Sequence, residues 1–229
     1  MGISLITIYD FTILITPYLE TIESELQYRL SYKYFWYRKQ NDTWNNYSNF
    51  IYTTVSWEAL MTRISETVSK FKIDKNEFFY YTINRWYNYW SALAVELIFT
   101  DLDGGIPAKN KKGRLVDFSL FGEKFDYKIS IFPKGFKKSL EHAQNYPKEL
   151  VYWLCNNQSQ ERRNHDHLEN RIFVVMYANN GEHWKLKAQI SWLKDIISTY
   201  VATFDDSKLF RLQLQPYKIT KAGLIWAIK

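Results

Sequence analysis

Two aspartates and a lysine lie close together in one short segment of the chain, at Asp117, Asp126 and Lys128. Apolar and polar residues alternate on both sides of the Gly-Glu pair at 122–123, which is the pattern of a β-hairpin with a two-residue turn. Counting outward from that turn pairs Ser119 with Asp126, and Asp117 with Lys128. Because directly opposed residues share a face of a sheet, the two carboxylates and the amine are predicted to project from the same side.

The predicted hairpin has a second, apolar face. It would carry five side chains: Phe118, Leu120, Phe125, Tyr127 and Ile129. On the polar face, two neighbouring carboxylates raise each other's pKa unless a cation joins them, and Mg²⁺ is a hard cation that takes oxygen ligands. A lysine beside such an ion can orient water or stabilise charge that builds on a phosphate. The alternative interpretation is an exposed sheet face with one Asp–Lys pair that contributes at most about 1 kcal/mol.

The composition is that of a globular protein that suits an anionic partner. The chain has 229 residues, of which 46% are apolar, 24% charged and 18% aromatic, with a formal net charge of +6. A positive net charge favours nucleic acid as a partner, and the aromatic content is typical of a large core or of an interface, which allows a homodimer. The single cysteine excludes an internal disulfide and is expected of a cytoplasmic protein. No apolar stretch is long enough to span a membrane, so no membrane partner is expected.

The order of predicted elements indicates an α/β fold. Residues 3–15 are compatible with either a strand or a helix, and 40–49 are predicted to form a loop. The other expected elements are helices after Pro17, over 56–71, 75–100, 136–158 (interrupted at Pro147) and 188–204, with strands over 170–177, 209–215 and 224–228. This order predicts a mixed central sheet, with residues 1–74 as a mainly helical N-terminal extension and residues 75–229 as the core domain.

The arrangement resembles a known group of enzymes. A helix that carries Glu96, then Asp117, then Asp126-Tyr127-Lys128, a helix and an apolar strand resemble the PD-(D/E)XK nuclease superfamily, whose restriction-endonuclease-like fold has an αβββαβ core. The chain departs from the family pattern at Val116, where proline would precede the first aspartate. The resemblance covers residues 75–177, a little under half of the chain.

The resemblance implies both a set of roles and a reaction. Asp117 and Asp126 would hold Mg²⁺ or Mn²⁺ together with Glu96 and the carbonyl of Tyr127, and Lys128 would be the catalytic lysine. The implied function is that of a metal-dependent endonuclease that hydrolyses phosphodiester bonds in nucleic acid, with DNA preferred over RNA, in restriction or phage defence. The alternative is a catalytically inactive nucleic-acid-binding or assembly protein on the same fold.

Basic side chains outside the hairpin are candidates for contact with nucleic-acid phosphates, although each of them could equally be a solvated surface residue. They are Lys134, Lys137, Lys138, Arg162 and Arg163. Lys109, Lys111, Lys112 and Arg114 could brace a backbone near the site, or only keep a loop soluble.

Several other residues are given structural rather than chemical roles. His165 and His167 lack the spacing of a zinc site and are assigned to a solvated loop. Trp86, Tyr87, Tyr89 and Trp90 are expected in the core or an interface rather than in a base-stacking platform. The glycine-rich nucleotide-binding motifs are absent, which argues against nucleotide-cofactor and NTP-driven functions.

Overall fold

The computed structural model describes the backbone of residues 8–108, 116–157 and 170–229, and within these ranges the side chains from residue 18 onward except that of residue 215. These residues belong to two compact units. The first comprises residues 1–95 with 187–192, and the second comprises 96–186 with 193–229. The predicted boundary between residues 74 and 75 coincides with the start of helix α4, and the two units divide within that helix.

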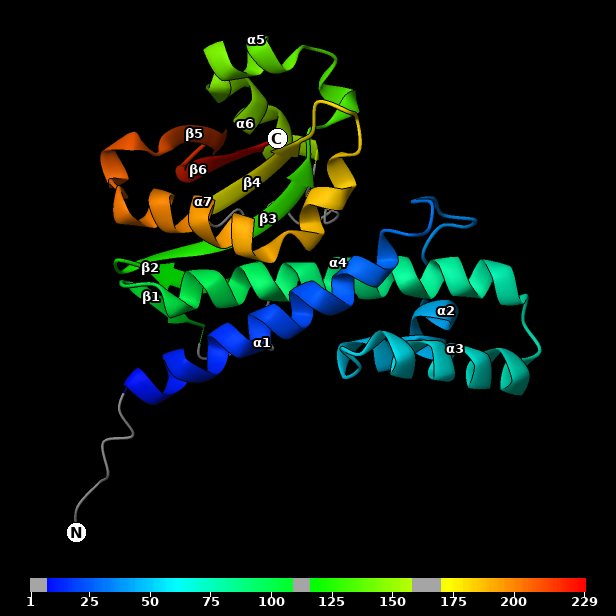
Figure 1. Ribbon diagram of the computed structural model, residues 1–229. Helices are drawn as coiled ribbons and strands as arrows, with labels where there is room; N and C mark the ends of the chain where they lie inside the picture. The colour runs from blue at the N-terminus through cyan, green and yellow to red at the C-terminus, as the bar shows by residue number, and fades with distance from the viewer. Residues whose placement is uncertain (1–7, 109–115, 158–169) are drawn as a thin grey trace. The chain divides into compact units, whose positions relative to one another are not determined.

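Helices form the described part of the first unit (Figure 1). They are α1 (Ile8–Arg29), α2 (Asp42–Tyr47), the 3₁₀ helix η1 (Asn49–Tyr52), α3 (Trp57–Phe71) and most of α4 (Lys75–Asp101). Residues 8–15 are therefore helical. The loop predicted over 40–49 was wrong, because the Asn41 side chain caps α2 by accepting a hydrogen bond from the Trp44 amide, and the buried Trp44 ring anchors the short helix.

Helices α3 and α4 begin where their capping residues predict. Ser56 accepts a hydrogen bond from the Ala59 amide, and Asp74 accepts one from the Glu77 amide. Inside α4, the indole N–H groups of Trp86 and Trp90 donate to the buried backbone carbonyls of Thr54 and Ile51. Trp86, Tyr87 and Trp90 are buried, which confirms their predicted place in the core, whereas Tyr89 is half-buried.

The second unit is built on a six-stranded sheet with the order β1-β2-β3-β4-β6-β5. The strands are β1 (Gly105–Pro107), β2 (Phe118–Leu120), β3 (Glu123–Ile131), β4 (Arg171–Tyr177), β5 (Phe210–Gln215) and β6 (Lys218–Ile228). The helical segments between them are η3 (Lys134–Phe136), α5 (Leu140–Asn145), α6 (Pro147–Asn157), η5 (His183–Ala188), α7 (Ile190–Ala202) and η6 (Asp206–Lys208).

The sheet is mixed, which confirms the predicted α/β class. Strands β1, β2 and β3 pair antiparallel, β3, β4 and β6 run parallel, and β5 returns antiparallel to β6. Helix α6 covers one face of the sheet, where Leu154 packs in a cluster with Phe173. Helix α7 covers the other face, where the Tyr200 hydroxyl lies over Gly223 (Figure 1). The strand predicted over 170–177 is present and almost wholly buried.

Candidate active site

The hairpin forms, but its turn lies one residue earlier than the predicted one. Strand β2 pairs with β3 through Phe118↔Phe125, Ser119↔Lys124 and Leu120↔Glu123. The two turn residues are Phe121 and Gly122, with φ of 47° and 86°, and positive φ at both positions is what a two-residue hairpin turn requires. The Phe121 ring stacks on Phe204 at 5.6 Å between centroids, a contact between distant parts of the sequence that the local pattern does not contain. The predicted pairing was therefore wrong by two positions.

A shift of two positions leaves every side chain on its predicted face, because side chains alternate with a period of two. Phe118, Leu120, Phe125 and Tyr127 are buried, as predicted for the apolar face, and Ile129 is half-buried. Asp126 and Lys128 therefore remain together on the opposite face. The predicted grouping of Asp126 and Lys128 is therefore correct, because a register error of two residues does not change the face on which a side chain lies.

Helix α4 and strand β1 fix the base of the hairpin. A Cβ on Gly105 would lie 1.9 Å from the carbonyl oxygen of Phe99, so only glycine allows β1 to approach the end of α4 this closely. The Phe99 ring stacks on Phe118 of β2 at 4.6 Å between centroids. Strand β1 was not predicted, since three residues that follow a helix end carry no periodic signal.

Four charged side chains meet where β2, β3 and β4 come together. The Lys128 amine donates to Asp126 Oδ1 at 2.8 Å, and Arg171 Nε lies 3.4 Å from Asp126 Oδ2. The carboxyl of Asp117 is in hydrogen-bonding contact with that of Asp126, and its Oδ2 accepts a hydrogen bond from the Tyr127 amide at 3.0 Å. The structure therefore gathers the three residues that the hairpin pattern singled out.

The electrostatic balance of this cluster is uneven. Burial, followed by the neighbouring Asp126 carboxylate, raises the pKa of Asp117 to about 6, although the Tyr127 amide and the Lys128 charge act in the opposite direction. Asp126 is 7% exposed and has two cations beside it. The negative charge of Asp117 is less well compensated by neighbouring cations than that of Asp126. A further cation beside Asp117 would favour its ionised form.

Arg171 is the member of the cluster that sequence reasoning missed. It opens β4 directly beside Asp126 in the parallel ladder and is 6% exposed. Its Nε and Nη1 atoms are buried and have no hydrogen-bond partner within the described ranges. The available signal was a lone cation at the start of an otherwise apolar strand, since a buried charge requires a partner.

The oxygen atoms around Asp117 suit a hard divalent ion. The Tyr127 amide points toward Asp117, and the Tyr127 carbonyl points to the same side of the strand, because the N–H and C=O of one strand residue face the same neighbour. Two carboxylates and one carbonyl are ligands that Mg²⁺ and Mn²⁺ accept. Helix α4 carries Glu96, which is half-buried. Among the described residues no three His, Cys, Asp or Glu side chains form a group that could hold a metal, so Glu96 does not complete a triad with Asp117 and Asp126.

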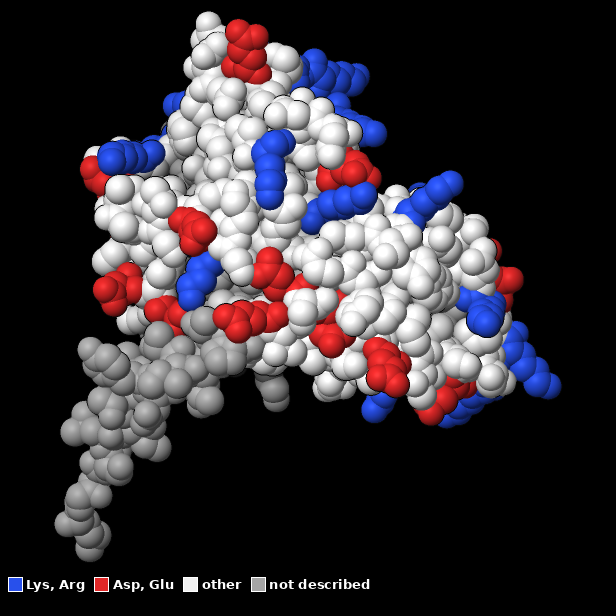
Figure 2. Space-filling view, viewed as in Figure 1, with Lys and Arg blue, Asp and Glu red and all other residues white. Residues whose placement is uncertain are grey.

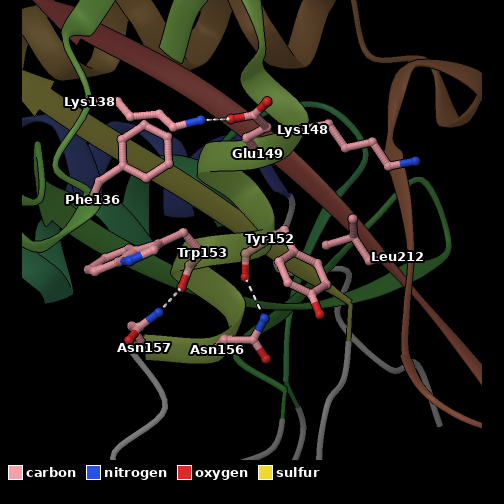
Figure 3. Close-up of a pocket in the computed structure, with 9 residues that line it drawn as sticks. All are labelled: Phe136, Lys138, Lys148, Glu149, Tyr152, Trp153, Asn156, Asn157 and Leu212. Atoms are coloured by element: carbon pink, nitrogen blue, oxygen red, sulfur yellow. Dashed lines mark hydrogen bonds and ion pairs between the residues drawn. The ribbon is translucent and has the colours of Figure 1, made fainter. Parts of the chain in front are cut away.

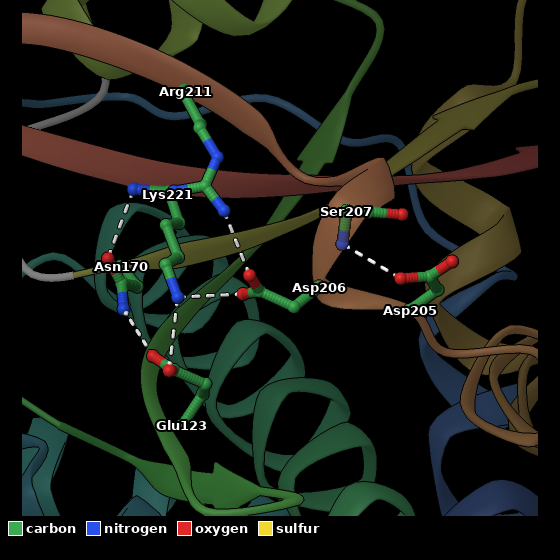
Figure 4. A network of polar contacts seen from close by, with 7 residues as sticks. All are labelled: Glu123, Asn170, Asp205, Asp206, Ser207, Arg211 and Lys221. Carbon is green, nitrogen blue, oxygen red and sulfur yellow. Dashed lines mark hydrogen bonds and ion pairs between the residues drawn. The ribbon is translucent and has the colours of Figure 1, made fainter.

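A polar network holds the strand starts next to the cluster (Figure 4). The Asn170 carbonyl accepts a hydrogen bond from the Asp126 amide, and its side chain joins Glu123 to the backbone of Lys221. The Lys221 amine lies 3.0 Å from Glu123 and 2.7 Å from Asp206, and these two hydrogen bonds raise its pKa. The network ties β3, β4 and β6 together at the end of the sheet where Asp126 lies.

The lysines predicted to contact phosphates lie at the opposite end of β3. Lys134 and Lys137 are exposed beyond the end of the strand, and five residues of strand from Asp126 to Ile131 span roughly 17 Å. Lys138 is bound to Glu149 and lies 3.1 Å from His142. Their role in phosphate binding stays a prediction.

The remaining sequence predictions fall outside the ranges that the structure describes. They concern Arg162, Arg163, Lys109, Lys111, Lys112, Arg114, His165 and His167.

The Lys138–Glu149 pair borders a groove of about 580 Å³ that is lined by residues of α6 and by Leu212 of β5 (Figure 3). Tyr152, Trp153 and Leu212 supply most of its apolar wall, and the side-chain amides of Asn156 and Asn157 donate to carbonyls of their own helix. The groove contains none of the four charged residues of the cluster, so we treat it as separate from the candidate active site.

On the face drawn in Figure 2, acidic and basic side chains are interspersed. No helix in the described part of the chain is both long and apolar enough to cross a membrane. No protein-family model, curated protein or solved structure matches this chain. The resemblance to the PD-(D/E)XK nucleases therefore rests on the residues and their arrangement alone.

Proposed function

We propose that this protein is a Mg²⁺- or Mn²⁺-dependent endonuclease that hydrolyses phosphodiester bonds in nucleic acid, with DNA as the preferred substrate. The observation that carries the proposal is the cluster of Asp117, Asp126 and Lys128 on one face of a hairpin. Separate strands bring these groups together despite the cost of placing two carboxylates in contact. Such an arrangement is expected where function outweighs stability.

The order of elements around the cluster supports the same proposal. Helix α4 precedes three antiparallel strands, helices α5 and α6 follow, and β4 then pairs parallel to β3. This order supports the αβββαβ arrangement of the restriction-endonuclease-like fold, with Asp126 on the third strand and Asp117 directly before the second. The finer assignment to that fold is part of the proposal.

Each residue of the cluster has a distinct part in the proposed reaction. Asp117, Asp126 and the Tyr127 carbonyl would hold the divalent ion, which when bound polarises a phosphate and lowers the pKa of a water molecule. Arg171 is buried and fixes Asp126 from one side. The Lys128 side chain is 39% exposed, so it can leave Asp126 to orient the attacking water or to stabilise charge on the phosphate.

Cleavage of supercoiled plasmid and of single-stranded DNA, with and without Mg²⁺, tests the proposal. We expect Lys128→Gln and Asp117→Asn each to lower the cleavage rate by about 10²-fold or more, because a group that stabilises transition-state charge is lost. Lys124→Gln is the matched control, since Lys124 is exposed on the same strand two residues before Asp126. Cleavage that persists in both site variants, or that needs no metal, would refute the mechanism.

A second candidate function is binding of nucleic acid without cleavage. Asp126 already has Lys128 and Arg171 as counter-ions, and no third acidic side chain joins the described cluster, which favours an inactive site. This candidate predicts binding in EDTA and no Mn²⁺-dependent rise in melting temperature. A rise that Asp117→Asn abolishes would instead favour the enzyme.

A further inference from the structure

An unbroken row of aromatic rings runs across part of the first unit. Tyr28 stacks on Trp57, Trp57 contacts Tyr32, and Tyr32 contacts Phe79, with centroid distances of 6.2, 5.5 and 5.1 Å. The row continues from Phe79 to Tyr80 at 5.2 Å.

Two more rings complete the row at its far end. Phe35 lies 4.5 Å from Tyr80 and 4.7 Å from Tyr37. Seven rings from three segments of the chain thus form one contiguous surface, which we call the aromatic row.

These rings do not belong to the core. Tyr28 is 56% exposed and Tyr37 is 45% exposed, and each of the five rings between them is half-buried. Apolar rings that pack against one another while all remaining accessible form a patch of the kind that marks an interaction site.

The surface is fixed in advance of any binding. The buried Arg29 guanidinium donates to the carbonyls of Tyr32 and Lys33, and the Asn84 amide donates to the carbonyl of Phe35. The Tyr37 hydroxyl accepts a hydrogen bond from Asn76 at 2.7 Å. A partner would therefore meet rings that are already ordered, which lowers the entropy cost of binding.

Three cations lie close in the sequence to members of the row or to a residue that contacts it. Lys33 follows Tyr32 in the chain, Lys39 lies two residues after Tyr37, and Lys75 precedes Asn76. All three are exposed, and none takes part in an ion pair within the ranges the structure describes. Of the two acids nearest to Lys75 in the sequence, Glu77 is paired with Arg38 at 2.7 Å, and Asp74 accepts a hydrogen bond from the Glu77 amide.

We propose that the aromatic row binds single-stranded nucleic acid. Exposed and half-buried rings near amines that form no ion pair in the described ranges suit an unpaired strand, because its bases stack on aromatic rings and its phosphates attract cations. Paired bases in a duplex would not present their faces to these rings. The inference deepens the proposed function by naming an unpaired strand as the part of the substrate that this surface holds.

Fluorescence anisotropy of a labelled oligothymidine of about 12 nucleotides, measured in EDTA, tests the proposal. We expect Tyr37→Leu to weaken binding between about fivefold and about a hundredfold, the loss expected for one stacked base. The double variant Lys33→Gln/Lys39→Gln should weaken binding and flatten its dependence on salt, because fewer phosphates are neutralised.

Matched controls come from exposed residues of the second unit. Tyr217→Leu and Lys148→Gln/Lys208→Gln remove an exposed ring and two exposed amines that do not belong to the aromatic row or to its neighbouring lysines, and they should leave affinity unchanged. Wild-type protein should prefer the single strand to a duplex of the same length. Absence of binding, equal binding to the duplex, or equal effects of the test and control variants would overturn the proposal.

Two further measurements separate this inference from its competitors. Asp117→Asn should bind the oligonucleotide like wild type. If it loses cleavage but keeps this binding, the result supports the proposed active site and leaves the proposal for the aromatic row intact. Sedimentation velocity measures self-association without nucleic acid. A dimer that Tyr37→Leu dissociates would assign the surface to a second copy of the chain and refute the proposal.

Discussion

Among the buried arginines of the described residues, Arg29 in the first unit and Arg171 in the second are held in different ways. Arg29 in the first unit is 0% exposed, and its terminal nitrogens donate to the carbonyls of Tyr32 and Lys33 and to the side-chain oxygen of Asn84. Arg171 in the second unit is 6% exposed, lies 3.4 Å from Asp126, and leaves Nε and Nη1 without a hydrogen-bond partner in the described part of the chain.

The difference separates a structural cation from one at a candidate site. The three oxygens that accept from Arg29 are neutral, and burial lowers the pKa of Arg29 to about 10. Arg29 is therefore held by directed hydrogen bonds to neutral oxygens, and these bonds connect the end of α1 to the residues that follow. Arg171 is held by charge, beside two carboxylates in contact. Two of its buried nitrogens, against Nε alone in Arg29, make no hydrogen bond within the described ranges. An incompletely satisfied buried charge is expected where the arrangement serves something other than stability.

From this contrast we expect the largest change in the free energy of unfolding on substitution of Arg29. Arg29→Met should lower the free energy of unfolding by about 3 kcal/mol or more, because it leaves the buried Asn84 oxygen and two partly buried carbonyls without their donors. Urea unfolding monitored by tryptophan fluorescence measures this loss, and Arg63→Met on the exposed side of α3 is the control. A loss below about 1 kcal/mol would mean that water replaces the guanidinium, and the structural role of Arg29 would be wrong.

A smaller effect of opposite sign is expected at Asp117. The pKa of Asp117 is about 6 in the folded protein, above the ordinary value of an aspartate, so the folded state binds the proton more tightly than the unfolded state does. Stability should therefore fall as the pH rises from about 4 to about 6 and then level off. Asp117→Asn removes this penalty and should stabilise the protein by about 2 kcal/mol at pH 8, with little change at pH 4.

Thermal unfolding of wild type and Asp117→Asn across this pH range measures the difference. Added Mg²⁺ should stabilise wild type at high pH and have no effect on the variant, since the ion binds the ionised carboxylate. If Asp117→Asn destabilises the protein equally at both pH values, burial and the neighbouring Asp126 carboxylate do not penalise the ionised form of Asp117.

Periodicity predicted much of the fold, because most elements of this chain carry their own signal. The caps at Ser56 and Asp74 locate α3 and α4, and the apolar run over 170–177 locates β4. Elements that depend on tertiary contacts were missed or misjudged. Strand β1 exists because Gly105 lets it approach Phe99, and no local pattern reports that approach.

The three residues of the candidate site could be predicted from the sequence, but the residues that contact them could not. The alternation of residues 117–128 places Asp117, Asp126 and Lys128 on one face for any even shift in register. Arg171 lies more than 40 residues away in sequence from Asp126, and only the parallel pairing of β4 with β3 brings the two together. The aromatic row likewise joins three segments, so no single stretch of the sequence indicates it.

The smallest expected effect on stability is at Arg171, and it sharpens the contrast with Arg29. Arg171→Met should cost only about 1 kcal/mol, because Lys128 still compensates Asp126 and the donors lost from Arg171 were in part unpaired. The same variant should bind Mn²⁺ about tenfold more tightly, since a positive charge that repels the ion from Asp126 is gone. Isothermal titration with Mn²⁺ and urea unfolding measure the two effects. Arg63→Met serves as a control for both, because Arg63 is an exposed arginine of the first unit. If Arg171→Met destabilises the protein as much as Arg29→Met and leaves Mn²⁺ affinity unchanged, the two arginines have the same structural role and the contrast between them fails.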